Sequence, residues 1–324
     1  MSSFTFSSNP ERKVLLSVAL VLAATEVGTH VFSRGFSDVQ HRNQIPAIAS
    51  SLGNAPPPRI LFLGNSLTRQ GVSLKSFADQ LRRHDVQVGG IFKVCPDDTT
   101  LRHWHYVFEG HFGNRFGGQA PDYVIVTFVR DHLSDQVDQR TRRMALNVAG
   151  MPQVVEVLCR DVRSLDEGAY FFAAHYLKAI AHQPEIKDGI LRRLIPHYHA
   201  EIQRLNEMQR TCRAKNRVPG PTRPEEARFT YDQLEQFVSM LHENHCHGVF
   251  CLMPLPGEQS LDANLVKTIE SRGMTFLDLR DLASHTEGHY SDGYHMDAVA
   301  ADIYSRAVAD ALTERLEGTG ACGE

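Results

Sequence analysis

The sequence predicts an α/β fold, a doubly wound and mainly parallel sheet of five strands with a helical insertion between strands three and four. Two observations indicate it. Short apolar runs, typical of strands buried on both faces of a parallel sheet, alternate with stretches of helical spacing, and this βαβ alternation places helices on both faces of the sheet. Between residues 136 and 245 the apolar spacing is helical only, which indicates the insertion.

The strands are recognised by their apolar runs and by the residues that end them. The first run stops at Gly64, the third follows Pro121-Asp122, and the fourth stops at Pro254. The five predicted strands cover residues 60–63, 86–94, 123–129, 249–253 and 274–279.

Helices are predicted between these strands and after the last one. Gly273 is the expected C-cap of a helix over residues 261–271, and residues 101–112 also have helical spacing. The final helix carries apolar residues at helical spacing, namely Val299, Ile303, Ala307, Val308 and Leu312. The predicted folded domain spans residues 59–316, including the insertion, and residues 317–324 are a tail.

The N-terminal region, residues 1–32, is predicted to be a membrane anchor or signal segment. Arg12 and Lys13 precede an apolar run that extends, with Glu26 as its acidic interruption, over residues 14–32. At 1.5 Å per residue this run is roughly 28 Å long, close to the thickness of the hydrocarbon core. No A-x-A sequence follows, so we expect an uncleaved anchor; a cleaved signal and a buried soluble helix are the alternatives. The basic pair predicts residues 1–13 in the cytoplasm and the rest on the extracytoplasmic side.

Residues 33–58 show neither helical nor strand periodicity in this interpretation. They end in Ala55-Pro56-Pro57-Pro58, a sequence typical of stiff polyproline II segments. The prediction is a Pro-rich tether, with the folded domain beginning near Arg59.

Composition excludes several classes of protein. With 34 Lys+Arg against 38 Asp+Glu, the net charge of −4 supplies no basic field for nucleic acid. Six cysteines form no C-x-x-C pair, and with 17 histidines a close histidine pair is weak support for a metal site. We therefore expect no nucleic-acid partner and no metal. The chemistry considered below also needs no cofactor.

Ligands of open α/β sheets bind beyond the carboxyl ends of the strands, which directs attention to Ser66. Ser66 follows the first strand, where the chain turns into a helix and a hydroxyl is exposed beside helical N–H groups. A serine here is also a good helix N-cap, and that alternative stays open. Near the C-terminus, Asp292 precedes His295 by three residues, a spacing that lets the carboxylate fix the imidazole tautomer.

These two segments together resemble the SGNH (GDSL-like) hydrolase superfamily of esterases and acyltransferases. Gly64-Asn65-Ser66 is similar to its Gly-Asp-Ser nucleophile motif, with Asn for Asp, and Asp292 to His295 matches its Asp-x-x-His motif. The resemblance covers residues 59–135 and 245–315. It implies a catalytic triad of Ser66, Asp292 and His295.

The resemblance also implies an oxyanion-hole Gly after the second strand and an Asn after the third. This chain has Cys95-Pro96-Asp97-Asp98-Thr99 and Val129-Arg130-Asp131-His132 there. The candidate oxyanion or substrate-binding residues are therefore Asn65, Asp98, Thr99 and Arg130. Arg130 could donate to an oxyanion or hold a substrate anion. Alternatively, it forms an ion pair with Asp97, Asp98 or Asp131.

The resemblance implies a membrane-anchored, extracytoplasmic serine esterase or O-acyltransferase that acts on acyl esters of a cell-surface glycan, beside a membrane acyl-donor protein. The alternative is a non-catalytic glycan-binding or assembly subunit whose oxyanion hole has degenerated. The departures at Asp98 and Arg130 favour the alternative, whereas the retention of Ser66, Asp292 and His295 favours the enzyme.

Overall fold

The fold is described from a computed structural model of the 324-residue chain. It describes all residues except 1–9, 34–36, 136–140, 199, 203, 206, 207, 209–228, 257–260, 287, 291–293 and 319–324. At residues 37, 130, 142 and 315–318 it describes the backbone alone. The chain divides into two compact units, Met1–Val39 with Arg163–Arg228, and Gln40–Val162 with Phe229–Glu324.

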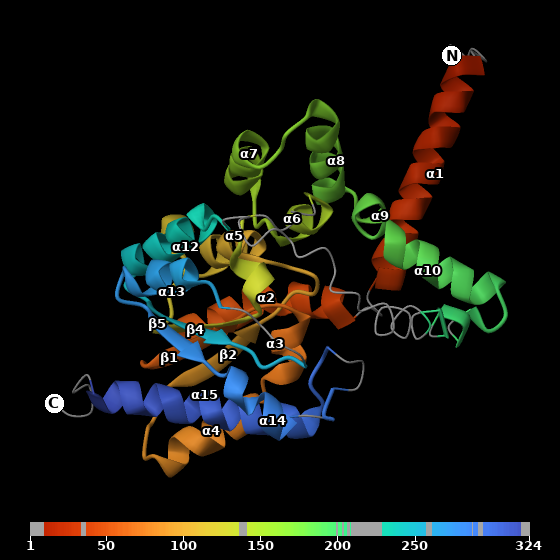
Figure 1. The fold of residues 1–324 in the computed structure, drawn as a ribbon. Coiled ribbons are helices and arrows are strands. Elements are labelled where there is room, and N and C mark those ends of the chain that lie inside the picture. The colour runs from red at the N-terminus through yellow and green to blue at the C-terminus, as the bar shows by residue number, and fades with distance from the viewer. Residues whose placement is uncertain are drawn as a thin grey trace. The chain divides into compact units, whose positions relative to one another are not determined.

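The larger unit is built on an all-parallel sheet of five strands in the order β2-β1-β3-β4-β5, which confirms the predicted fold class (Figure 1). Leu63 pairs with Val94 on one side and with Val126 on the other, so the carboxyl ends of three strands meet there. The strands are β1 (Arg59–Leu63), β2 (Gly90–Val94), β3 (Tyr123–Phe128), β4 (His247–Leu252) and β5 (Thr275–Asp278).

Helices of this unit cover both faces of the sheet. They are α2 (Ser37–Asn54), α3 (Ser66–Gly71), α4 (Leu74–Arg83), α5 (Leu101–His111), α6 (Thr141–Asn147), α7 (Met151–Arg160), α12 (Asp232–Glu243), α13 (Ala263–Glu270), α14 (Ala283–Thr286) and α15 (Ala298–Gly318). Short 3₁₀ segments occupy Asn114–Phe116, Arg130–Leu133 and Arg280–Leu282. Figure 1 shows α4 and α15 on one side of the strands and α5, α12 and α13 on the other.

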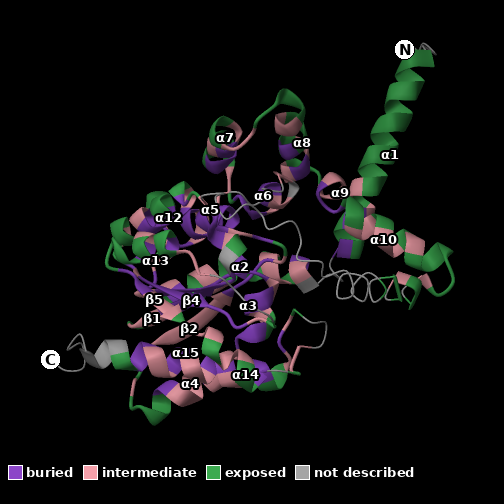
Figure 2. Ribbon diagram, viewed as in Figure 1, coloured by how far each residue is buried: buried purple, intermediate pink, exposed green. Residues whose placement is uncertain are grey.

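Alternating side chains of the strands pack into two separate hydrophobic cores, one on each face of the sheet. Leu61 and Leu63 pack with Trp104, whereas Ile60 and Phe62 face the opposite core. The first core includes residues of α2, α5, α12 and α13, and the second includes residues of α3, α4 and α15. The central strands β1, β3 and β4 are therefore buried on both faces, which is why their sequences are nearly continuous apolar runs (Figure 2).

The prediction of a tether over residues 33–58 is wrong for the segment that forms α2. Ile45, Ile48, Ala49 and Leu52 lie at the i, i+3, i+4 and i+7 spacing of one helix face, and all four pack into the first core. Pro46 lies within this helix. Because proline usually breaks a helix, its presence argues against a helix here when only the sequence is read. The folded part of the sheet unit thus begins before Arg59, with α2.

The helical insertion divides between the two units. α7 belongs with the sheet: Val154 and Val157 are buried, and Arg102 of α5 forms an ion pair of 2.8 Å with Asp161 at the end of α7. In the smaller unit are α1 (Pro10–Ser33), α8 (Leu165–Tyr176), α9 (Lys178–Ala181) and α10 (Gln183–Leu194). α12 is the crossover helix that leads into β4.

α1 is long and apolar enough to cross a membrane, and it is the one such helix in the described part of the chain. Its apolar side chains from Val14 to Leu22 are more than half exposed (Figure 2). This observation agrees with the predicted N-terminal segment at the level of length and composition.

Candidate active site

Ser66 and His295 meet at the carboxyl edge of the sheet, although 229 residues separate them in the sequence. Ser66 is the first residue of α3, directly after β1, and His295 lies in the loop before α15. The Nε2 atom of His295 lies 3.0 Å from the Oγ atom of Ser66, within hydrogen-bond distance. In a sheet of order 2-1-3-4-5 the direction of the strand order reverses between β1 and β3, and this is the position where such folds bind ligands.

The turn that presents Ser66 is held by its neighbours. Asn65 caps α3, because its Oδ1 accepts a hydrogen bond of 3.0 Å from the Leu67 N–H. The backbone N–H of Asn65 donates to Thr68 Oγ1, which accepts a further bond of 2.6 Å from the Thr127 hydroxyl. A Cβ on Gly64 would lie 1.8 Å from Thr68 Oγ1, so only glycine fits there. The cap is therefore Asn65, and Ser66 is free of that role.

The amide nitrogen of Asn65 reaches the segment after β2. It donates a hydrogen bond of 3.0 Å to the carbonyl oxygen of Thr99. Thr99 is only 1% exposed; its hydroxyl donates to the Pro96 carbonyl and accepts from Trp104 Nε1. Both polar ends of Asn65 and the Thr99 hydroxyl are thus engaged within the protein, so their interactions position the turn carrying Ser66.

The two acidic residues after β2 lie close to arginines of α3 and α6. Asp97 forms an ion pair of 2.7 Å with Arg69 of α3. Asp98 has a positive φ of 55° and lies 3.7 Å from Arg143 of α6. Arg130 begins the 3₁₀ segment after β3, but its side chain lies outside the described residues, as does the whole of Asp292.

Sequence reasoning missed His132, which lies in the segment after β3. Its Nε2 lies 3.3 Å from the Asn65 amide nitrogen, and its ring meets Trp104 edge to face at 6.0 Å. Burial lowers the pKa of His132 to about 4, so the ring is neutral at pH 7. Its position four residues past the end of β3, at the same edge as Ser66, is the signal that could have indicated it.

The loop that carries His295 is pinned at both ends, which the sequence did not indicate. Tyr290 and Met296 form an antiparallel bridge across it. The Tyr290 hydroxyl donates a hydrogen bond of 2.7 Å to the carbonyl oxygen of Pro254. Just outside the bridge, His289 Nδ1 lies 2.9 Å from an Asp297 carboxylate oxygen. The other oxygen of Asp297 accepts bonds from backbone N–H groups at the start of α15, and these bonds lower the pKa of Asp297.

Two further observations bear on the interpretation of the site. Among the described residues, no group of three or more His, Cys, Asp or Glu side chains is placed to hold a metal ion. No known protein family matches the chain, and no curated protein matches its sequence.

Proposed function

We propose that this protein is a membrane-anchored serine esterase or O-acyltransferase that works through an acyl-enzyme on Ser66. The observation that carries the proposal is the 3.0 Å approach of His295 Nε2 to Ser66 Oγ at the edge of the sheet where α/β proteins bind ligands. A nucleophile within hydrogen-bond reach of a base is the arrangement that acyl transfer needs. The exposed apolar face of α1 supports the anchor.

In the proposed reaction, Ser66 Oγ attacks the acyl carbonyl carbon while His295 Nε2 accepts the hydroxyl proton. The tetrahedral intermediate collapses, and the imidazolium returns its proton to the leaving alcohol, which leaves the acyl group on Ser66. Water or a second alcohol, activated by the same imidazole, then takes the acyl group. Asp292 orients His295 in this scheme. The backbone N–H of Ser66, at the start of α3, is the proposed oxyanion donor, and one such donor is typically worth about 2.7–4 kcal/mol.

The proposed substrate is an acyl ester, acetyl above all, of a cell-surface glycan on the extracytoplasmic side, with a membrane acyl donor as partner. This substrate class comes from the resemblance of Gly64-Asn65-Ser66 and of the Asp292 to His295 segment to SGNH enzymes. Hydrolysis and transfer use the same residues and differ only in whether water or a sugar hydroxyl accepts the acyl group.

A serine-directed fluorophosphonate probe tests the proposal on the full-length protein. We expect one equivalent of label on Ser66, no label on Ser66→Ala, and labelling slowed by about 10²–10⁴-fold in His295→Asn, because the general base is removed. Ser271→Ala is the matched control, since the Ser271 hydroxyl is exposed and donates only to a nearby helix carbonyl. Label that persists in Ser66→Ala would refute the assignment.

A second assay separates hydrolysis, transfer and the non-catalytic alternative. Full-length protein is given p-nitrophenyl acetate with and without a neutral oligosaccharide, and the sugar is then analysed by mass spectrometry. Acetylated sugar indicates a transferase, and acetate alone indicates an esterase. Oligosaccharide binding with neither product and no probe label indicates a glycan-binding subunit.

A further inference from the structure

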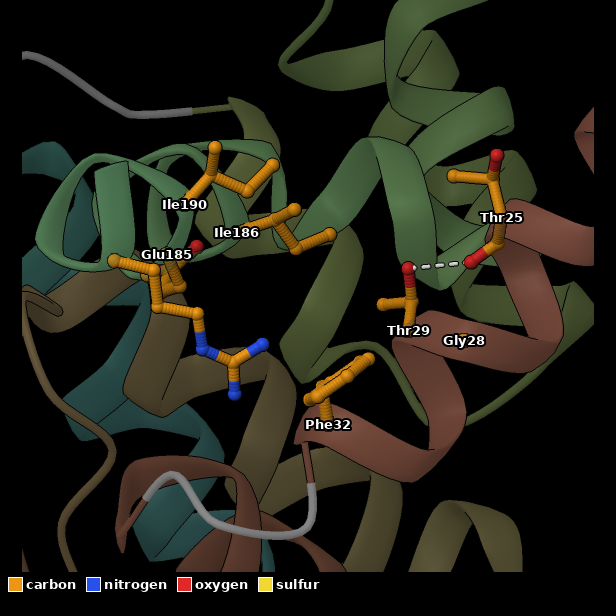
Figure 3. Close-up of a pocket in the computed structure, with 9 residues that line it drawn as sticks. Thr25, Gly28, Thr29, Phe32, Glu185, Ile186 and Ile190 are labelled. Atoms are coloured by element: carbon orange, nitrogen blue, oxygen red, sulfur yellow. Dashed lines mark hydrogen bonds between the residues drawn. The ribbon is translucent and has the colours of Figure 1, made fainter.

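The smaller unit contains a cavity of about 410 Å³ between α1 and α10. Figure 3 shows Phe32 and Thr29 of α1 facing Ile186 and Ile190 of α10 across it. The Thr29 hydroxyl donates a hydrogen bond to the Thr25 carbonyl of its own helix, so its donor is already used within the helix. The volume falls in the range of small-molecule sites, about 300–1,000 Å³, and the walls are chiefly apolar.

Glu26 is an acidic residue within the apolar helix α1. Its carboxylate oxygens accept hydrogen bonds of 2.8 and 2.9 Å from the backbone N–H groups of Lys178 and Ala179 in α9. An acidic residue that is expensive in hydrocarbon is thereby satisfied by protein. Exposed apolar residues of α1 run from Val14 to Leu22 and continue after Glu26 at Val27, Val31 and Phe32. This helix lines the cavity with residues from Thr25 to Phe32, in the last part of the apolar run. If α1 spans a membrane, the cavity is therefore placed near the end of the span.

Two glycines line the cavity from the interiors of the two helices, Gly28 in α1 and Gly189 in α10. Glycine in a helix interior is less favourable than alanine by about 1 kcal/mol. A Cβ built at either position meets no heavy atom within 4 Å, so packing within the protein requires neither glycine. Both glycines therefore border a space that the described residues do not fill.

A cation marks one side of this cavity. The guanidinium carbon of Arg193, in the last turn of α10, lies 5.2 Å from the centre of the Phe32 ring. Arginine binds phosphate in a bidentate manner. Glu185 also lines the cavity, but it is eight residues away on the same helix, about 12 Å along the axis.

We propose that this cavity binds an acyl chain of one membrane phospholipid, with the lipid phosphate on Arg193. The proposal rests on the proposed membrane anchorage, because the bilayer supplies the ligand. It is independent of the proposed chemistry at Ser66. A phospholipid held here would fix α1 against α10 at the membrane surface.

Photocrosslinking of full-length protein in detergent micelles tests the site. The probe is phosphatidylglycerol with a diazirine in one acyl chain, and crosslinked peptides are mapped by mass spectrometry. We expect label on the segments that contain Gly28 and Gly189. Gly189→Trp fills the open space and should reduce this label about tenfold, equivalent to about 1.4 kcal/mol of binding. Gly189→Ala is the control for helix propensity and should retain the label.

A matched pair of arginine variants tests the proposed phosphate contact. Arg193→Gln should weaken labelling, whereas Arg192→Gln should not, because Arg192 lies outside the cavity lining and pairs with Asp188. A diacylglycerol probe with the same chains should label less than phosphatidylglycerol, and equal labelling would overturn the role given to Arg193. Crosslinks spread along Val14 to Leu22 and unchanged by Gly189→Trp would indicate bulk lipid contact alone and overturn the site.

The same samples separate this proposal from the others. Fluorophosphonate labelling of Ser66 reports the catalytic proposal and should not change in Gly189→Trp. Because the lipid probe is added in micelles, crosslinking also tests the cavity if the full-length chain fails to fractionate with membranes. A failure of Ser66 labelling therefore leaves the lipid crosslinking result interpretable, and a failure of crosslinking leaves the labelling result interpretable.

Discussion

The contacts of the two polar side-chain atoms of Asn65 explain why an amide matters at this position. Oδ1 caps α3 at the Leu67 N–H, and Nδ2 donates to the Thr99 carbonyl. An aspartate could keep the cap but would set a carboxylate oxygen against that carbonyl. Asn65→Asp should therefore destabilise the fold by about 1–3 kcal/mol, the usual cost of a buried unsatisfied polar group.

Chemical denaturation of Asn65→Asp and wild type measures this difference, and probe labelling of Ser66 shows whether the turn has moved. Asn65→Ala removes both bonds and should lose the cap as well, about 0.5–2 kcal/mol in addition. Unchanged stability in Asn65→Asp would mean that the bond to Thr99 contributes nothing to the fold.

A buried histidine predicts how stability depends on pH. His105 is 7% exposed, and burial lowers its pKa from 6.5 to about 4. Between these values the unfolded chain binds a proton that the folded chain does not, so stability falls as pH falls through the window. At pH 5 the loss from this residue is about 2 kcal/mol relative to neutral pH.

Urea unfolding at pH 7 and pH 5 tests this expectation, with His105→Gln as the variant that cannot titrate. The pH-dependent difference should shrink in the variant by about that amount, whatever the change in its stability at pH 7. His132 has a similarly lowered pKa, so part of the dependence should remain. An identical pH dependence in wild type and variant would show that His105 titrates normally in the fold.

At the scale of elements, strands were the easier part to predict. The apolar runs that became β1, β3 and β4 are buried on both faces, so their composition alone marks them. β2 is shorter than its run: Val86 and Val88 pack against the core, but the ladder begins only at Gly90. Apolar composition indicates which residues are buried, whereas the hydrogen-bonded length of a strand depends on the length of the strand beside it. β1 begins at Arg59, which pairs with Gly90.

Helix α2 gives the clearest prediction at this scale. Leu52 is fully buried against the sheet, whereas Ser51 beside it is exposed. Leu52→Ala should lower the free energy of unfolding by about 2–5 kcal/mol, as expected for a leucine truncated in a packed core. Ser51→Ala should leave it nearly unchanged. Thermal or urea unfolding measures both, and equal stability of the two variants would mean that α2 does not belong to the cooperative core.

At the scale of the whole molecule, the sequence predicted that Ser66 and His295 lie together but not the contacts that hold them. Strand order explains this success, because residues that follow parallel strands share one edge of the sheet. Ser66 and His295 were therefore expected together. The partners of Asn65, Asp97 and Asp98 depend on how α3, α5 and α6 pack, and no local pattern encodes such packing. The bonds from Glu26 to α9 were equally hidden, since they join segments 152 and 153 residues apart.

The anchor gives the last prediction. Full-length protein should remain in the membrane pellet after carbonate extraction, because α1 is long and apolar enough to cross a membrane and its apolar side chains from Val14 to Leu22 are exposed. Leu20→Arg puts a charge within that stretch, at a cost of up to about 2.5–3.5 kcal/mol near the bilayer centre, and should shift protein toward the supernatant. Leu20→Ala is the matched control and should stay in the pellet. Full-length protein recovered in the supernatant, with an N-terminus near Thr25 by sequencing, would instead identify residues before that point as a cleaved signal.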